Sequence, residues 1–66
     1  MRLAVNGEPR EVAEGTTLPA LLSSLGLKVG TVVVEHNGTA LLRSEVERAV
    51  LATGDRLELV RAVAGG

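Results

Sequence analysis

The sequence predicts an α+β fold in which one main helix packs on one face of a mixed sheet of four to five strands. Two Asn-Gly pairs, at positions 6–7 and 37–38, each follow a short strand-like segment, and this dipeptide is a strong hairpin signal. Between them, four leucines recur at the spacing i, i+3, i+4 and i+7 that marks one face of a helix. An alternating segment over 57–62 supplies a further strand.

The first hairpin should begin at Met1, turn at Asn6-Gly7 and return antiparallel over 8–13. Both turn residues tolerate the positive φ that a type I′ turn requires at its two central positions. Pro9 cannot donate a hydrogen bond to a neighbouring strand, so we expect the return strand at an edge of the sheet.

The leucine stripe predicts a helix of two to three turns that presents Leu18, Leu21, Leu22 and Leu25 to the sheet. Thr17 is the expected N-cap. Pro19 lies in the first turn, where its missing N–H does no harm, and Gly26 suits the left-handed position after the helix.

Residues 31–36 are mostly β-branched and predict a strand with Val32 and Val34 on one face. A turn at 37–38 and a short return strand over 39–42 should follow. The first strand should lie parallel to and beside a later one, because crossover connections are right-handed and carry the helix across both strands. This arrangement is the β-grasp layout.

The polar run 43–48 predicts about one turn of α- or 3₁₀-helix, and Ser44 and Glu47 have the spacing of a capping box. Gly54-Asp55 predicts a third turn before the last strand. Residues 1–62 should therefore form one β-grasp domain, followed by a flexible C-terminal tail over 63–66.

The composition excludes several classes of function. The 66 residues include no Cys, no aromatic residue and one His, which excludes a disulfide framework, a thiolate or histidine metal site and base stacking. A net charge of −1 with scattered basic residues offers no nucleic-acid surface, and the apolar runs are too short for a signal peptide or a membrane span. We expect a cytoplasmic protein that is monomeric when free.

A chain of this length buries too small a core for an enclosed active site, because every buried polar group would replace scarce apolar contact. We therefore expect no catalytic residue, no metal and no bound cofactor. The acidic residues Glu8, Glu11 and Glu14 are interpreted as a solvated sheet edge. His36 is interpreted as a partly buried histidine at the end of a strand, since no second ligand or base lies near it in the sequence.

Two features could carry a function. By strand parity, the face opposite the helix should present Arg2, Ala4, Val60 and Ala62. This shallow apolar patch favours docking of a partner, while incidental apolar surface is the alternative.

The second feature is the C-terminal sequence, Val63, Ala64, Gly65 and Gly66, which follows the last strand directly. A glycine carboxylate has no Cβ, so it can enter a narrow channel and be approached closely from any side. We interpret Gly66 as a carboxylate that is modified inside another protein, with Val63, Ala64 and Gly65 threading the partner's active site. Slack after the last strand is the alternative.

In order and spacing, these segments resemble the ThiS-like sulfur carriers of bacterial thiamine biosynthesis, a ubiquitin-like β-grasp family. The resemblance spans the whole chain and rests on Asn6-Gly7-Glu8, Thr17-Leu18, Leu21-Leu22, Leu25-Gly26, Val34-Glu35, Asn37-Gly38, Arg43-Ser44-Glu45, Gly54-Asp55, Glu58 and Arg61-Ala62-Val63-Ala64-Gly65-Gly66. Leu42, Val46 and His36 depart from the residues usual in that family.

The resemblance implies that an E1-like adenylyltransferase adenylates Gly66 with ATP and that the adenylate becomes a thiocarboxylate. A cysteine desulfurase or another donor would supply the sulfur, and thiazole synthase would receive it. The chain would then be a carrier and not an enzyme, with ATP consumed by its partner. Alternatives are a sulfur carrier for tRNA 2-thiolation or molybdopterin synthesis, a ubiquitin-like protein modifier, and a β-grasp module that only binds.

Overall fold

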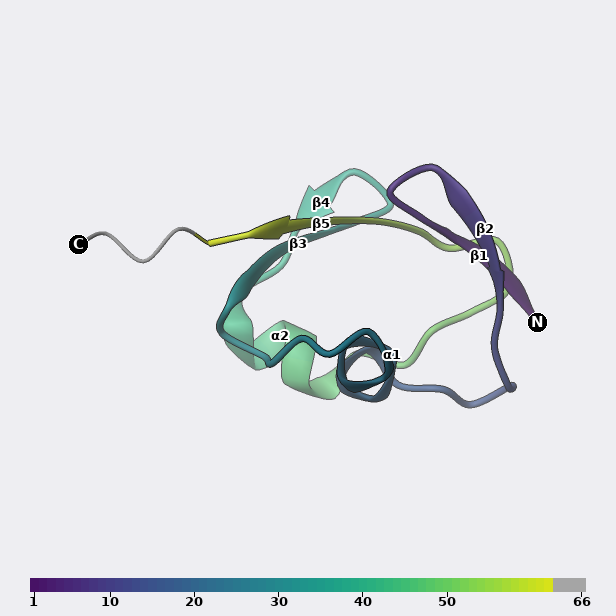
Figure 1. The fold of residues 1–66 in the computed structure, drawn as a ribbon, viewed down its shortest axis with the longest axis horizontal. Helices are drawn as coiled ribbons and strands as arrows, with labels where there is room; N and C mark the ends of the chain where they lie inside the picture. Colours follow the sequence, from purple (N-terminus) through teal and green to yellow (C-terminus); the bar gives the residue numbers. More distant parts are fainter. Residues whose placement is uncertain (63–66) are drawn as a thin grey trace.

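A computed structural model describes residues 1–62, which form one sheet with both helices on the same side of it (Figure 1). The elements in chain order are β1 Arg2–Val5, β2 Glu8–Glu11, α1 Leu18–Ser24, β3 Val32–His36, β4 Thr39–Ala40, α2 Arg43–Arg48 and β5 Arg56–Arg61. The strand order is β2-β1-β5-β3-β4. The central strands β1 and β5 run parallel and the other pairs are antiparallel, which confirms the predicted mixed sheet.

The core lies between the sheet and the two helices. α1 contributes Leu18, Leu21 and Leu22, each at most 2% exposed, whereas Leu25 is only partly buried because it caps the end of the helix. The other buried apolar residues come from the strands, α2 and the following loop: Leu3, Val5, Val34, Val46, Leu51 and Leu57. In β1, β3 and β5 the buried residues alternate with more exposed ones, as a half-buried sheet requires, whereas every residue of the edge strands β2 and β4 is exposed.

The first hairpin has the predicted turn. Asn6 and Gly7 adopt φ values of 51° and 81°, and Val5 pairs with Glu8 across the turn. β2 lies at the sheet edge, as Pro9 predicts. The pairing ends where the Val12 N–H donates to the Met1 carbonyl at 2.9 Å, so the return strand is shorter than the predicted 8–13.

Helix α1 has the predicted caps. The Thr17 hydroxyl accepts a hydrogen bond from the Ala20 N–H at 3.2 Å, and Gly26 adopts a left-handed φ of 74° directly after the C-cap. A side chain at Gly26 would be strained in this conformation.

The predicted capping box in α2 is wrong by two residues. The helix begins at Arg43 with Leu42 as its N-cap, so Ser44 already lies inside it. The acid at the third helical position is then Glu45, whose carboxylate accepts the Leu42 N–H at 2.7 Å. In a capping box the acidic residue occupies the third helical position, because only from there can its side chain accept a hydrogen bond from the backbone N–H of the N-cap residue.

Candidate functional site

The predicted modified residue, Gly66, lies outside the described residues, as do Val63, Ala64 and Gly65. The structure does describe the strand that leads to them. β5 is paired with β3 from Leu57 to Arg61, and the Ala62 N–H donates to the Thr31 carbonyl at 2.9 Å. The C-terminal residues therefore follow a strand that is held to the sheet up to residue 62.

The four residues predicted for docking share the outer face of the sheet but do not form one patch. β1 and β5 pair with Ala4 opposite Arg56. Val60 is four residues further along β5, about 13 Å away at ~3.3 Å per residue. Arg2 and Ala4 thus lie at one end of this face, and Val60 and Ala62 lie at the other.

The apolar neighbour of Val60 is Val33, which sequence reasoning missed. The two residues lie opposite each other on antiparallel strands, and their side chains are 62% and 52% exposed. We call this cross-strand pair the valine pair. Only the register of β3 against β5 identifies it, and no local sequence signal predicts that register.

Next to the valine pair, Glu35 lies directly opposite Glu58 on the same face. Both side chains are exposed. Like charges in directly opposed positions destabilise a sheet by roughly 0.2–1 kcal/mol. The outer face therefore combines an apolar spot with an acidic one.

His36 belongs to a hydrogen-bonded cluster that the sequence did not reveal. Its Nε2 lies 3.0 Å from Oδ2 of Asp55, a residue only 8% exposed. The same carboxylate accepts the Ala52 N–H at 2.8 Å and an Asn37 side-chain N–H at 3.1 Å. The expectation of a partly buried strand-end histidine is confirmed, and its partner is a carboxylate that reaches it from the third turn.

This cluster sets the pKa of Asp55. Burial alone would raise that pKa, but the hydrogen bonds from Ala52, His36 and Asn37 outweigh burial and hold the pKa of Asp55 below its ordinary value. His36 lies opposite Leu57, at the start of β5, so the cluster is at the far end of this strand from Arg61. The cluster joins the end of β3 to the third turn, which is a structural role.

The three edge glutamates are exposed, as predicted. Glu11 accepts a hydrogen bond from Arg2 Nε at 2.9 Å. Among residues 1–62, no group of three or more His, Asp or Glu side chains is arranged to hold a metal ion. Within the same residues, neither helix has the length and apolar character needed to cross a bilayer.

Comparison with known proteins identifies the family. The model of the ThiS family matches residues 3–66. The chain belongs to the ThiS family. The resemblance to ThiS-like sulfur carriers is thereby confirmed at the level of the family.

Relatives of similar length carry the same name. The chain is 40% identical to the sulfur carrier protein ThiS of Thermus thermophilus over 62 residues, which are 94% of this chain and 95% of the relative. A crystal structure of the thiamine biosynthesis protein ThiS from Geobacter metallireducens superposes with a TM-score of 0.82 at 36% identity and full coverage of both chains. The ubiquitin-like β-grasp fold is thereby confirmed.

A second group of relatives is longer. The chain is 38% identical to a thiazole synthase of Magnetococcus marinus over 66 residues, and 36% identical to a thiazole synthase of Paramagnetospirillum magneticum. In both cases all of this chain is matched, but it spans only 20% of the relative. A ThiS-like segment is therefore part of these two proteins.

Proposed function

We propose that this ThiS-family protein is a sulfur carrier of thiamine biosynthesis that acts as a co-substrate and not as an enzyme. The observation that carries this proposal is the family match over residues 3–66, supported by a full-length relative named a sulfur carrier. Gly66 is the residue that we assign to the chemistry.

The proposed reaction has two steps. The Gly66 carboxylate is ionised at neutral pH and attacks the α-phosphorus of ATP on an E1-like adenylyltransferase, with pyrophosphate as the leaving group. A thiol reduces the persulfide of a cysteine desulfurase to sulfide and is itself oxidised to a disulfide, or another donor supplies sulfide directly. The sulfide then attacks the acyl carbon, and AMP leaves. The net change at Gly66 is the exchange of one carboxylate oxygen for sulfur.

Thiazole synthase is the proposed acceptor of this sulfur. In two relatives, a segment similar to this chain is part of a protein named thiazole synthase. A carrier joined to its acceptor in one polypeptide holds the two at high effective concentration, which supports direct transfer between them. The ATP used in the first step fits the cytoplasmic location expected from the sequence.

The outer sheet face is the proposed docking surface for the adenylyltransferase. Its apolar spot is the valine pair, and the neighbouring Glu35 and Glu58 would face basic groups on the partner. We place the binding energy at the valine pair and not at Arg2 and Ala4, which lie at the far end of the face.

The deciding experiment measures the intact mass of the full chain after incubation with the E1-like enzyme from its own cells, ATP and a sulfur donor. The expected result is a gain equal to the mass of sulfur minus that of oxygen, located on Gly66 by fragmentation. Omission of ATP is the control and should leave the mass unchanged. No gain with an enzyme that is active on another carrier would contradict the proposal, and conjugates on target lysines would indicate a protein modifier instead.

A further inference from the structure

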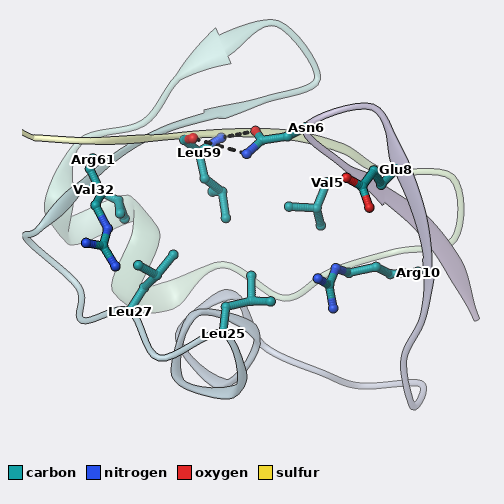
Figure 2. A pocket seen from close by; sticks show the side chains of 9 residues that line it. All are labelled: Val5, Asn6, Glu8, Arg10, Leu25, Leu27, Val32, Leu59 and Arg61. Carbon is teal, nitrogen blue, oxygen red and sulfur yellow. Dashed lines mark hydrogen bonds between the residues drawn. The ribbon is translucent and has the colours of Figure 1, made fainter.

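A cleft of about 330 Å³ lies between the end of α1 and the helix-facing side of the sheet (Figure 2). Its apolar lining comes from the strands and from the segment that follows α1: Val5, Leu25, Leu27, Val32 and Leu59. The polar lining consists of Asn6, Glu8, Arg10 and Arg61. In Figure 2 the guanidinium groups of Arg10 and Arg61 lie on opposite sides of the cleft.

One wall of the cleft is the edge of β5 where β1 ends. β1 pairs with β5 only at Ala4 and Val5, because the chain turns at Asn6. Beyond Val5, the side chain of Asn6 replaces the main chain of β1 as the hydrogen-bonding partner of β5. Its Oδ1 accepts the Leu59 N–H at 2.7 Å, and its Nδ2 donates to the Leu59 carbonyl at 3.3 Å (Figure 2).

The next main-chain groups on this edge belong to Arg61. Alternate residues of a central strand direct their N–H and C=O groups to the same neighbour, and the Leu57 carbonyl and both Leu59 groups point toward β1. Arg61 follows the same alternation, but within residues 1–62 no strand pairs with it on this side. Such an open edge can pair with another extended segment.

The cleft also has an excess of positive charge. Arg10 and Arg61 outnumber the single carboxylate of Glu8 among the lining residues. In the part of the chain that the structure describes, neither guanidinium forms an ion pair with a carboxylate. A guanidinium binds a carboxylate through two parallel hydrogen bonds, so the cleft is complementary to an acidic group.

We propose that this cleft binds an extended segment of a partner protein that carries apolar side chains and a carboxylate. The segment continues the position of β1 beside β5 and forms main-chain hydrogen bonds with Arg61. Every second side chain points toward the helices, so apolar residues enter between Leu25, Leu27 and Leu59. The carboxylate pairs with Arg10 or Arg61 at the rim.

The site has a consequence that rests on the proposed function. β5 leads directly into the C-terminal residues, so a segment bound beside Arg61 would hold the base of the carrier tail. The peptide binding itself does not depend on sulfur chemistry. It is also separate from the valine pair, because Val33 and Val60 lie on the opposite face of the sheet.

The test is an NMR titration of the full, ¹⁵N-labelled chain with the blocked peptide acetyl-Asp-Val-Ile-Val-Asp-Val-amide. We expect saturable shifts of the Asn6, Leu59 and Arg61 amides, and several-fold slower hydrogen exchange of the Arg61 N–H. The control peptide has lysine in place of both aspartates and should bind at least ~10-fold more weakly, because it meets two guanidinium groups with like charge.

Charge-reversal variants locate the site. Arg10→Glu and Arg61→Glu should each weaken binding by about 10-fold. Arg56→Glu is the matched control, since Arg56 lies on the same strand but faces the other side of the sheet beside Ala4, and it should bind as the wild type does. The amide spectra of the variants report whether each is folded.

Three results would overturn the proposal: no saturable shift at millimolar peptide, equal binding of the lysine peptide, or shifts confined to Val33 and Val60. The titration contains no ATP and no activating enzyme. A negative result therefore leaves the carrier proposal standing, and a failed mass gain leaves the peptide site standing.

Discussion

At the scale of single residues, Asp55 is the side chain on which the third turn depends. Its carboxylate holds Ala52, Asn37 and His36 together, and its pKa is lowered in the folded state. A carboxyl with a depressed folded pKa stabilises the fold above its unfolded pKa, about 3.9, and this stabilisation is lost as the pH falls through the folded pKa. Urea unfolding should therefore show a stability that is flat near neutral pH and falls below about pH 4.

Asp55→Ala is the variant that tests this role. It leaves the Ala52 N–H and the Asn37 amide without their acceptor, and we expect a loss of about 1–3 kcal/mol in the free energy of unfolding at pH 7. Glu47→Ala, an exposed acid on α2, is the control and should change stability by less than about 0.5 kcal/mol. Equal stability of Asp55→Ala and the wild type would contradict the assignment.

The same cluster shows where residue-level prediction stops. Asn6, Asn37 and Gly26 were assigned correctly because a turn or a helix end is determined by neighbours in the chain. The contact of His36 with Asp55 depends on how β3 and the third turn meet in space. No residue spacing in the sequence indicates that His36 and Asp55 are in contact, so the partial burial of His36 could be predicted but its partner could not.

At the scale of elements, the helix and the strands follow from periodicity, whereas the pairing register does not. The leucine spacing predicts α1, and the handedness of crossovers predicts that the first strand lies parallel to a later one. The structure shows that this later strand is β5. The docking residues were taken from parity alone, which gives the face of a residue but not its neighbours. The register places Val33 opposite Val60, so the exposed apolar side chains lie together at the end of the outer face away from Arg2 and Ala4.

The valine pair makes a prediction for docking to the activating enzyme. Val60→Asp and Val33→Asp should each weaken binding at least ~10-fold by calorimetry, because a charge would be buried in the apolar part of the interface. Both side chains are more than half exposed, so the loss of folding stability should stay near 1 kcal/mol or less, the span of strand propensity.

Another exposed apolar residue, Leu42, provides the control for that experiment. Leu42 is 69% exposed but lies before α2 and outside the sheet. Leu42→Asp adds the same charge, and aspartate is a favoured N-cap, so the variant should fold and bind the enzyme as the wild type does. Undiminished binding by the two valine variants would remove the outer face as the interface.

At the scale of the whole molecule, β5 is longer than β1, and this difference shapes the end of the sheet that precedes residue 62. β1 ends at Val5, opposite Leu57, while β5 continues to Arg61. The part of β5 that extends past β1 has the valine pair on the outer face of the sheet and the cleft on the helix-facing side. Residues 63–66 follow this part of β5 in the sequence. Partner contacts on both faces would therefore act on the strand that carries Gly66.

Deletion of Gly66 tests whether this residue is required for sulfur loading but not for folding stability. Within residues 1–62, all nine buried apolar residues lie between Leu3 and Leu57, so we expect the deletion to leave Tm unchanged within a few degrees, where 1 kcal/mol corresponds to about 4–8 °C. The sulfur-dependent mass gain should be lost completely.

Leu22→Ala, which opens a cavity in the core at a cost of about 2–5 kcal/mol, is the control that shows that the melting assay detects core damage. A Tm loss from the deletion comparable to that of Leu22→Ala would mean that the last residue is packed against the fold, and a retained mass gain would mean that the sulfur is loaded elsewhere.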